Sequence, residues 1–147
     1  MDDGSVTSSK VLPSKQRFAI WKQWWLMARP LRQSFQFAFQ GIWHVLKTQR
    51  NARIQLCVGL LALALGLWLG LSPEGWGVLI LTITLVLFAE LMNTALEFLA
   101  DAACPNYNPL IGVAKDVAAG AVLLAAIGSV VVGLLLLGPP FVKLLLR

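Results

Sequence analysis

Three long apolar runs constrain the fold of this chain more than any other feature. They cover about residues 54–71, 76–98 and 117–137. Each is long enough to cross a hydrocarbon core of roughly 30 Å at about 1.5 Å per helical residue. Backbone groups in lipid must be hydrogen-bonded within their own segment, so we expect three transmembrane helices. The chain is 58% hydrophobic and only 13% charged, which a soluble domain of 147 residues would not accommodate.

The region before the first run has a different composition. Residues 1–16 are polar and rich in serine, which predicts a disordered tail. Residues 17–53 are basic and contain Trp21, Trp24 and Trp25, whose rings favour the headgroup level of a membrane. From Leu31 onward, apolar residues recur at spacings of three and four, which predicts an amphipathic helix on the membrane surface.

These patterns divide the chain into four parts. They are the tail 1–16, a basic interfacial segment 17–53, a three-helix membrane domain 54–138 and a short tail 139–147. The turn 72–75 closes the first apolar run, and Gly138, Pro139 and Pro140 are expected to close the third.

The distribution of cations predicts the orientation. Nine of the twelve Lys and Arg residues precede Ile54, the 72–75 turn has none, and the loop 102–114 leads directly to Lys115. The N-terminus and the second loop are therefore expected in the cytoplasm, although Lys143 and Arg147 argue mildly for the opposite. The same distribution favours anionic lipid headgroups over nucleic acid as the partner of the basic region.

Polar residues interrupt the end of the second apolar run, in FAELMNTALEFLAD (88–101). On an ideal helix they fall within roughly 80° of one another, on one face. Ionisable groups inside a membrane span are costly, and they normally face protein or water. We call this face the acidic stripe; its members are Glu90, Asn93, Glu97 and Asp101.

Further charged residues are expected at the same membrane level as the acidic stripe. Lys115 and Asp116 open the third apolar run, and KTQRNAR (47–53) precedes the first. Carboxylates can hold Mg²⁺, and lysine and arginine can hold phosphate oxygens. Phosphoryl transfer depends mostly on such positioning and charge neutralisation. From the residues alone, the chain is an oligomeric membrane protein with a Mg²⁺ or proton site at the cytoplasmic interface.

Three alternatives share these features. The acidic stripe is also compatible with a structural polar network between helices, or with an ion or proton pathway. A non-catalytic assembly factor that binds lipid through its tryptophans is the third. The chain has no GxxxxGK[ST], DFG or HRD motif, so no familiar nucleotide-binding motif decides between them.

Two separated motifs resemble a known family. ELMNTALEFLAD (90–101), followed by AKDVAAGAV (114–122), is similar to the prokaryotic diacylglycerol kinase and undecaprenol kinase family. The resemblance covers about residues 34–138. It implies a homotrimer in the bacterial inner membrane, with three membrane helices and a surface helix per chain. It also implies transfer of the γ-phosphoryl group of ATP to a lipid hydroxyl at the cytoplasmic face.

The resemblance assigns roles to individual residues. Glu90 takes the place of the catalytic base, Asn93 that of a positioning residue and Glu97 that of a metal ligand. Gln49 stands where many members have a second glutamate ligand for Mg²⁺, and His44 is expected to be structural. The nucleotide-contacting positions fall on Asn106, Tyr107, Asn108, Lys115 and Asp116.

The lipid acceptor is open at this stage. Diacylglycerol and undecaprenol both present a primary hydroxyl at a similar depth. The TQRN sequence and the long N-terminal extension favour undecaprenol over diacylglycerol.

Overall fold

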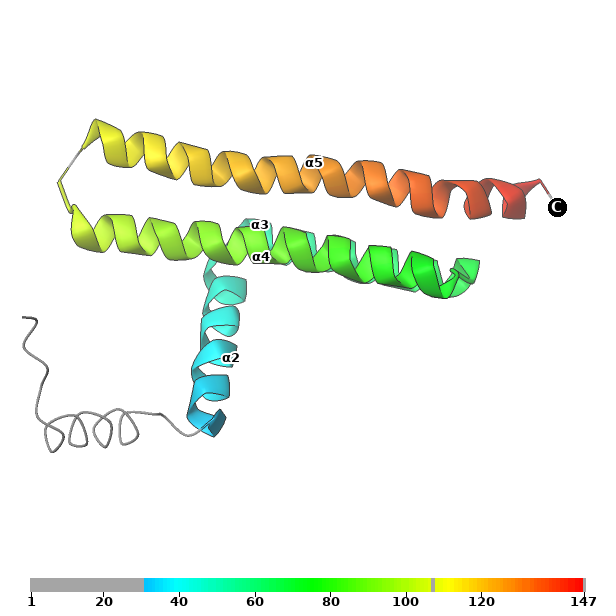
Figure 1. Ribbon diagram of the computed structural model, residues 1–147, viewed down its shortest axis with the longest axis horizontal. Coiled ribbons are helices and arrows are strands. Elements are labelled where there is room, and N and C mark those ends of the chain that lie inside the picture. The colour runs from blue at the N-terminus through cyan, green and yellow to red at the C-terminus, as the bar shows by residue number, and fades with distance from the viewer. Residues whose placement is uncertain (1–30, 107, 147) are drawn as a thin grey trace, which may run out of the picture. The chain divides into compact units, whose positions relative to one another are not determined.

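The computed structural model describes residues 31–106 and 108–146, and its described residues contain four α-helices and no strand. This confirms the all-α expectation. The tail 1–16, the Trp-rich segment and Tyr107 lie outside the described residues. The helices are α2 (Leu31–Thr48), α3 (Arg50–Leu69), α4 (Pro73–Ala103) and α5 (Pro109–Leu145) (Figure 1).

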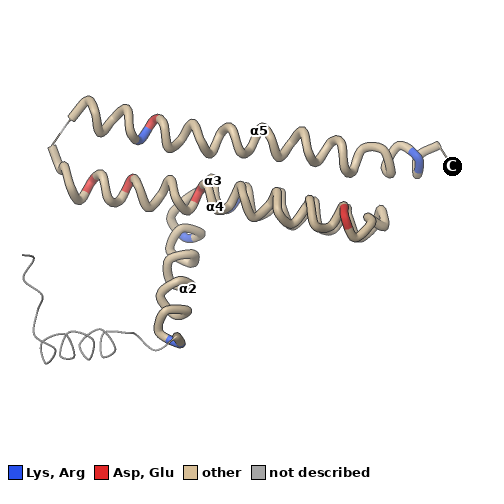
Figure 2. The backbone as a smooth tube through the Cα atoms, in the orientation of Figure 1, with Lys and Arg blue, Asp and Glu red and all other residues tan. Residues whose placement is uncertain are grey.

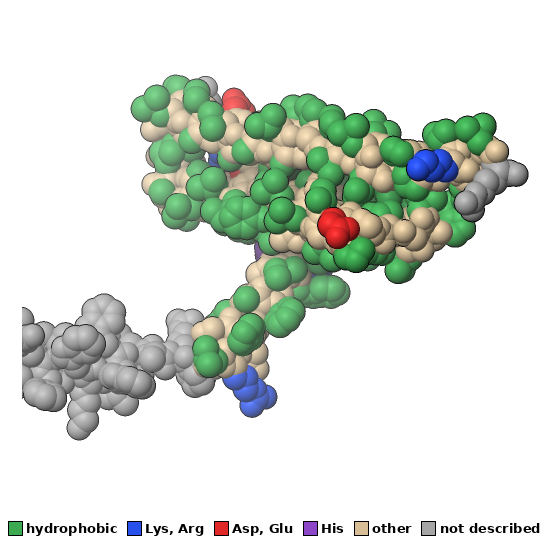
Figure 3. All heavy atoms as spheres, turned by 45° about the vertical axis from the view of Figure 1, so that its right-hand side comes forward, with side chains coloured by type: hydrophobic (Ala, Val, Ile, Leu, Met, Phe, Trp, Pro, Cys, Tyr) green, Lys and Arg blue, Asp and Glu red, His purple; other side chains and the backbone are tan. Residues whose placement is uncertain are grey.

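Three of these helices are membrane spans by length and composition. Among the described residues, α3, α4 and α5 are long and apolar enough to cross a bilayer. They lie side by side, and α4 packs against both α3 and α5 (Figure 1). Hydrophobic side chains dominate the face of this unit seen in Figure 3. The predicted integral membrane fold is therefore confirmed.

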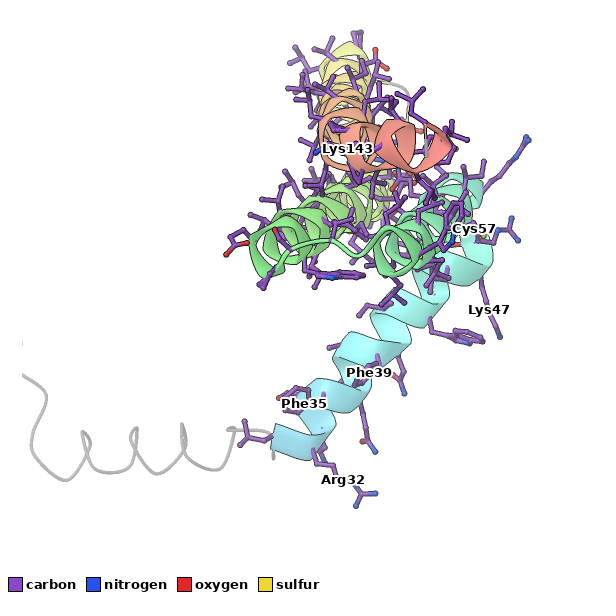
Figure 4. All side chains as sticks on the ribbon, turned by 90° about the vertical axis from the view of Figure 1, so that its right-hand side faces the viewer. Arg32, Phe35, Phe39, Lys47, Cys57 and Lys143 are labelled. Atoms are coloured by element: carbon purple, nitrogen blue, oxygen red, sulfur yellow. The ribbon has the colours of Figure 1, made fainter. Side chains whose placement is uncertain are left out.

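The chain forms two compact units, residues 1–40 and 41–147. The described part of the first unit is the beginning of α2, where every residue from Leu31 to Gln40 is exposed. Arg32, Phe35 and Phe39 project outward from the helix (Figure 4). The amphipathic helix exists as predicted, and its place on a membrane surface stays a prediction.

Local sequence signals explain the turn between α3 and α4. Gly70 ends α3 with φ of 67°, a left-handed conformation that glycine adopts without steric cost. Ser72 then caps α4, because its Oγ accepts a hydrogen bond from the backbone N–H of Gly75 at 3.2 Å. Pro73 occupies the first turn of α4, where its missing N–H is not needed.

Two helices are longer than the sequence predicts. α4 continues past the second apolar run to Ala103, so the acidic stripe lies on one continuous helix, as expected. The expectation that Gly138, Pro139 and Pro140 end the third helix is wrong, because α5 continues through both prolines to Leu145. Phe141 packs edge to face on Trp68 of α3 with ring centroids 6.4 Å apart. This contact holds the extension against the bundle, and membrane helices tolerate proline where neighbouring groups compensate.

Candidate active site

Three polar pairs follow one another along the half of α4 that leads to α5. One joins α4 to α3, one lies within α4, and one joins α4 to α5. Figure 2 shows the acidic residues of α4 gathered towards this end of the helix, apart from one near its beginning. The pairs are Gln55–Glu90, Asn93–Glu97 and Asp101–Lys115.

Glu90 is buried between α3 and α4. Only 3% of its surface is exposed. Gln55 of α3 donates a hydrogen bond from Nε2 to Glu90 Oε2 at 3.4 Å. Thr94, 1% exposed, donates from Oγ1 to the backbone carbonyl of Glu90 at 3.0 Å. A buried carboxylate without a partner is expensive in an apolar environment, so the Gln55 amide is what makes this position tolerable.

Asn93 and Glu97 form a second pair one helical turn further along. Asn93 Nδ2 donates to Glu97 Oε1 at 2.9 Å. Asn93 Oδ1 is buried and has no hydrogen-bond partner among the described residues. Glu97 is half-buried. The two side chains therefore present neighbouring oxygen atoms, the ligand type that Mg²⁺ prefers.

Lys115 closes the series at the start of α5. Its Nζ donates to Asp101 Oδ1 across the connection between α4 and α5. The side chains are 34% and 66% exposed, respectively. Asp116 is exposed and, as the next residue, points about 100° away around the helix. The structure thus brings Lys115, but not Asp116, to the acidic stripe.

The loop before α5 has a structural role in its described part. Asn108 caps α5, because its Oδ1 accepts a hydrogen bond from the backbone N–H of Leu110 at 2.9 Å. Asn106 is exposed, and its carbonyl accepts a hydrogen bond from the Cys104 thiol at 3.4 Å. The expected contacts of Asn106, Tyr107 and Asn108 with nucleotide stay predictions.

Comparison of the sequence with known proteins identifies the family of this chain. Residues 36–137 match the sequence pattern of the family described as prokaryotic diacylglycerol kinase. This chain belongs to that family. It is an integral membrane lipid kinase of bacterial type that uses a nucleotide phosphoryl donor. The expected family is confirmed, and the ion-pathway and assembly-factor alternatives are not favoured.

Similar relatives of the kinase carry two different names. A diacylglycerol kinase of Synechocystis is 43% identical over 125 residues, 84% of this chain and 71% of that protein. An undecaprenol kinase of Bacillus subtilis is 36% identical over 107 residues, 73% of this chain and 87% of that protein. A diacylglycerol kinase of Escherichia coli is 35% identical over 82 residues, 56% of this chain and 67% of that protein.

The predicted metal ligands of the kinase come from two helices. Glu97 is in α4, and Gln49 is the half-buried residue directly before α3, where its side chain makes no capping hydrogen bond. His44 packs edge to face on Phe98 with ring centroids 5.5 Å apart, which brings the end of α2 to the turn of α4 that carries Glu97. The described residues contain no group of three His, Cys, Asp or Glu side chains able to hold a metal. Mg²⁺ sites often use one or two carboxylates together with substrate phosphates, so these donors fit.

Sequence reasoning missed Gln55. It is a single amide in an apolar run and belongs to neither family-like motif. A signal was nevertheless present, because a polar side chain inside a membrane span normally faces a polar partner on another helix. Only the packing of α3 against α4 identifies that partner as Glu90.

Proposed function

We propose that this kinase transfers the γ-phosphoryl group of ATP to the primary hydroxyl of diacylglycerol or undecaprenol. The proposal rests on the buried Glu90 carboxylate, because it lies in a membrane helix and its side-chain partner among the described residues is a neutral amide. Such a group is suited to accept a proton from an alcohol. The names of similar relatives include both lipids, so they do not decide the preference for undecaprenol.

Glu90 acts as the general base in this proposal. The lipid hydroxyl donates its hydrogen to the Glu90 carboxylate, and its oxygen attacks the γ-phosphorus of ATP. A bond forms between the lipid oxygen and phosphorus, and the bond from phosphorus to the bridging oxygen breaks. The electron pair of that bond leaves with ADP, and the proton stays on Glu90. Asn93, one turn along α4, helps to place the reacting groups.

In this proposal, Lys115 binds the phosphates of the nucleotide and Glu97 binds the metal ion. Lys115 is partly exposed and can exchange its bond to Asp101 for bonds to phosphate oxygens. Asp116, Asn106, Tyr107 and Asn108 complete the nucleotide side of the site. Glu97, with its neighbour Asn93 Oδ1 and with Gln49, would hold Mg²⁺. Bound Mg²⁺ neutralises negative charge on the phosphate oxygens during transfer.

The site lies at the cytoplasmic face of the inner membrane in this proposal. The end of α4 and the beginning of α5 lie together through the Asp101–Lys115 pair, and α3, whose first turn carries Arg50 and Arg53, begins beside the half of α4 that holds the acidic stripe. Cations concentrate on the cytoplasmic side of membrane proteins. We also propose a homotrimer, because the three membrane spans of one chain can scarcely enclose a polar site.

One experiment tests the proposed function. The purified protein in lipid vesicles is offered diacylglycerol and undecaprenol separately, with ATP labelled at the γ-phosphate and with Mg²⁺. We expect labelled lipid phosphate, and the ratio of the two products identifies the acceptor. Absence of labelled product from both lipids, in protein that retains its helical spectrum, would reject the proposal.

A further inference from the structure

We propose that Gln55 is a positioning residue that orients Glu90 for proton transfer from the lipid hydroxyl. This inference rests on the proposed function, in which Glu90 is the general base. It starts from a hydrogen bond that reaches the buried carboxylate from another helix, Gln55 Nε2 to Glu90 Oε2 at 3.4 Å.

The orientation of the Gln55 amide follows from chemistry. A carboxylate only accepts hydrogen bonds, so the nitrogen of the amide must face it and the oxygen must face away. Gln55 Oε1 is then left buried without a partner among the described residues. An unpartnered buried oxygen destabilises the fold, and a leucine at position 55 would not introduce one. The amide thus loses a hydrogen bond at its oxygen and serves Glu90 at its nitrogen, so its role lies with the carboxylate.

The surrounding packing fixes the distance between the two helices. Ala52 and Gly59 flank Gln55 by one turn on the same face of α3, and both are buried. A Cβ at Gly59 would lie 3.0 Å from Cγ2 of Ile83 in α4. Small residues on both sides of Gln55 let the backbones approach closely, so the amide meets Glu90 from a rigid position.

A neutral donor suits this role better than a cation. Lysine or arginine at position 55 would stabilise the charged carboxylate strongly and make it a poor proton acceptor. The amide instead holds Oε2 and leaves Oε1 without a partner among the described residues, so Oε1 is the atom that receives the hydroxyl proton. Bond formation at phosphorus then proceeds as described for Glu90.

The test compares Gln55→Leu and Gln55→Ala with wild type, using full-length protein in vesicles. Initial rates are measured over a grid of ATP and lipid concentrations. We expect kcat to fall roughly tenfold to hundredfold, the range for a disturbed general base, and both KM values to stay within about twofold. Cys57→Ala, on an exposed position of α3, is the matched control and should keep wild-type kinetics.

The Gln55→Leu variant distinguishes a positioning role of Gln55 from a packing role. It retains the volume of glutamine, so a purely structural role predicts that Gln55→Leu keeps activity within about twofold of wild type, and that result would overturn the inference. If the leucine variant does not assemble, Gln55→Ala decides by the same criterion. The Gln55→Leu effect should also shrink in a Glu90→Asp background, because the shorter carboxylate no longer reaches residue 55.

The failure of this inference differs from the failure of the proposed function. If wild type produces no lipid phosphate, the proposed function fails. If wild type is active and neither Gln55 variant lowers kcat, only the role of Gln55 fails.

Discussion

Lys115 of α5 donates a hydrogen bond to Asp101 of α4, fourteen residues earlier in the chain. The pair joins the end of the acidic stripe to the first turns of the last helix. Asp101 is exposed and Lys115 partly exposed, and solvent-accessible ion pairs contribute only about 0–1 kcal/mol to stability. Folding therefore depends little on this pair, which leaves Lys115 free to bind phosphate.

The two members of this pair should consequently differ in their effect on catalysis. We expect Lys115→Met to lower phosphorylation by roughly a hundredfold, mainly through a higher KM for ATP, because hydrogen bonds from lysine to phosphate are charge-assisted. Asp101→Asn should cost less than about tenfold. Equal losses in both variants, measured by steady-state kinetics, would indicate that the ion pair itself is what activity needs.

Glu90 is the residue whose removal should matter most. We expect Glu90→Gln nearly to abolish phosphorylation, because the amide retains the shape of the side chain but cannot accept the hydroxyl proton. The oligomeric state and helical content should not change. Glu74→Gln, at the exposed beginning of the same helix, is the matched control. Turnover of Glu90→Gln within tenfold of wild type contradicts the role of general base.

The Mg²⁺ requirement tests Glu97 and Gln49 together. Glu97→Ala should raise the Mg²⁺ concentration needed for half-maximal activity, since it removes a carboxylate ligand. Gln49→Glu should lower that concentration, because it adds a negative charge where the chain has an amide. Titration of activity with MgCl₂ at fixed ATP measures both effects. Unchanged curves for both variants would remove these residues from the metal site.

The close approach of α3 and α4 gives a prediction about stability. Gly59→Leu places a side chain where a Cβ alone would lie 3.0 Å from Ile83, so we expect a loss of about 1–3 kcal/mol. Gly120→Leu is the control, because no atom beyond the adjacent residues and nearby backbone of its own helix lies within 4 Å of the position of a Cβ there. Thermal unfolding in detergent measures both. A Gly59 variant as stable as the Gly120 variant would mean that the helices separate freely.

The sequence predicted the parts of this structure that depend on periodicity and composition. Three membrane helices follow from the lengths of the apolar runs, and the shared face of Glu90, Asn93 and Glu97 follows from helix geometry alone. The pairing of Lys115 with the end of this face needed only the short loop between them. The family motifs then indicated which chemistry these residues serve.

Other features depend on tertiary packing and were not predictable from local patterns. The role of Gln55 becomes visible only through its hydrogen bond to Glu90, which is on another helix. Pro139 and Pro140 predict a helix end, yet the contact of Phe141 with Trp68 stabilises the continuation of α5. Asn108 is predicted to contact nucleotide, and the sequence did not indicate that its side chain also caps α5.

The length of α5 has a consequence for the bilayer in which the kinase works. Its 37 residues span about 55 Å, well above the roughly 30 Å of a typical hydrocarbon layer. The ends of α5 must therefore extend beyond the acyl chains, or the helix must tilt. Either adjustment changes the distance of Lys115 from the lipid hydroxyl along the bilayer normal. Turnover should therefore pass through a maximum as vesicle thickness is varied with monounsaturated lipids of increasing chain length.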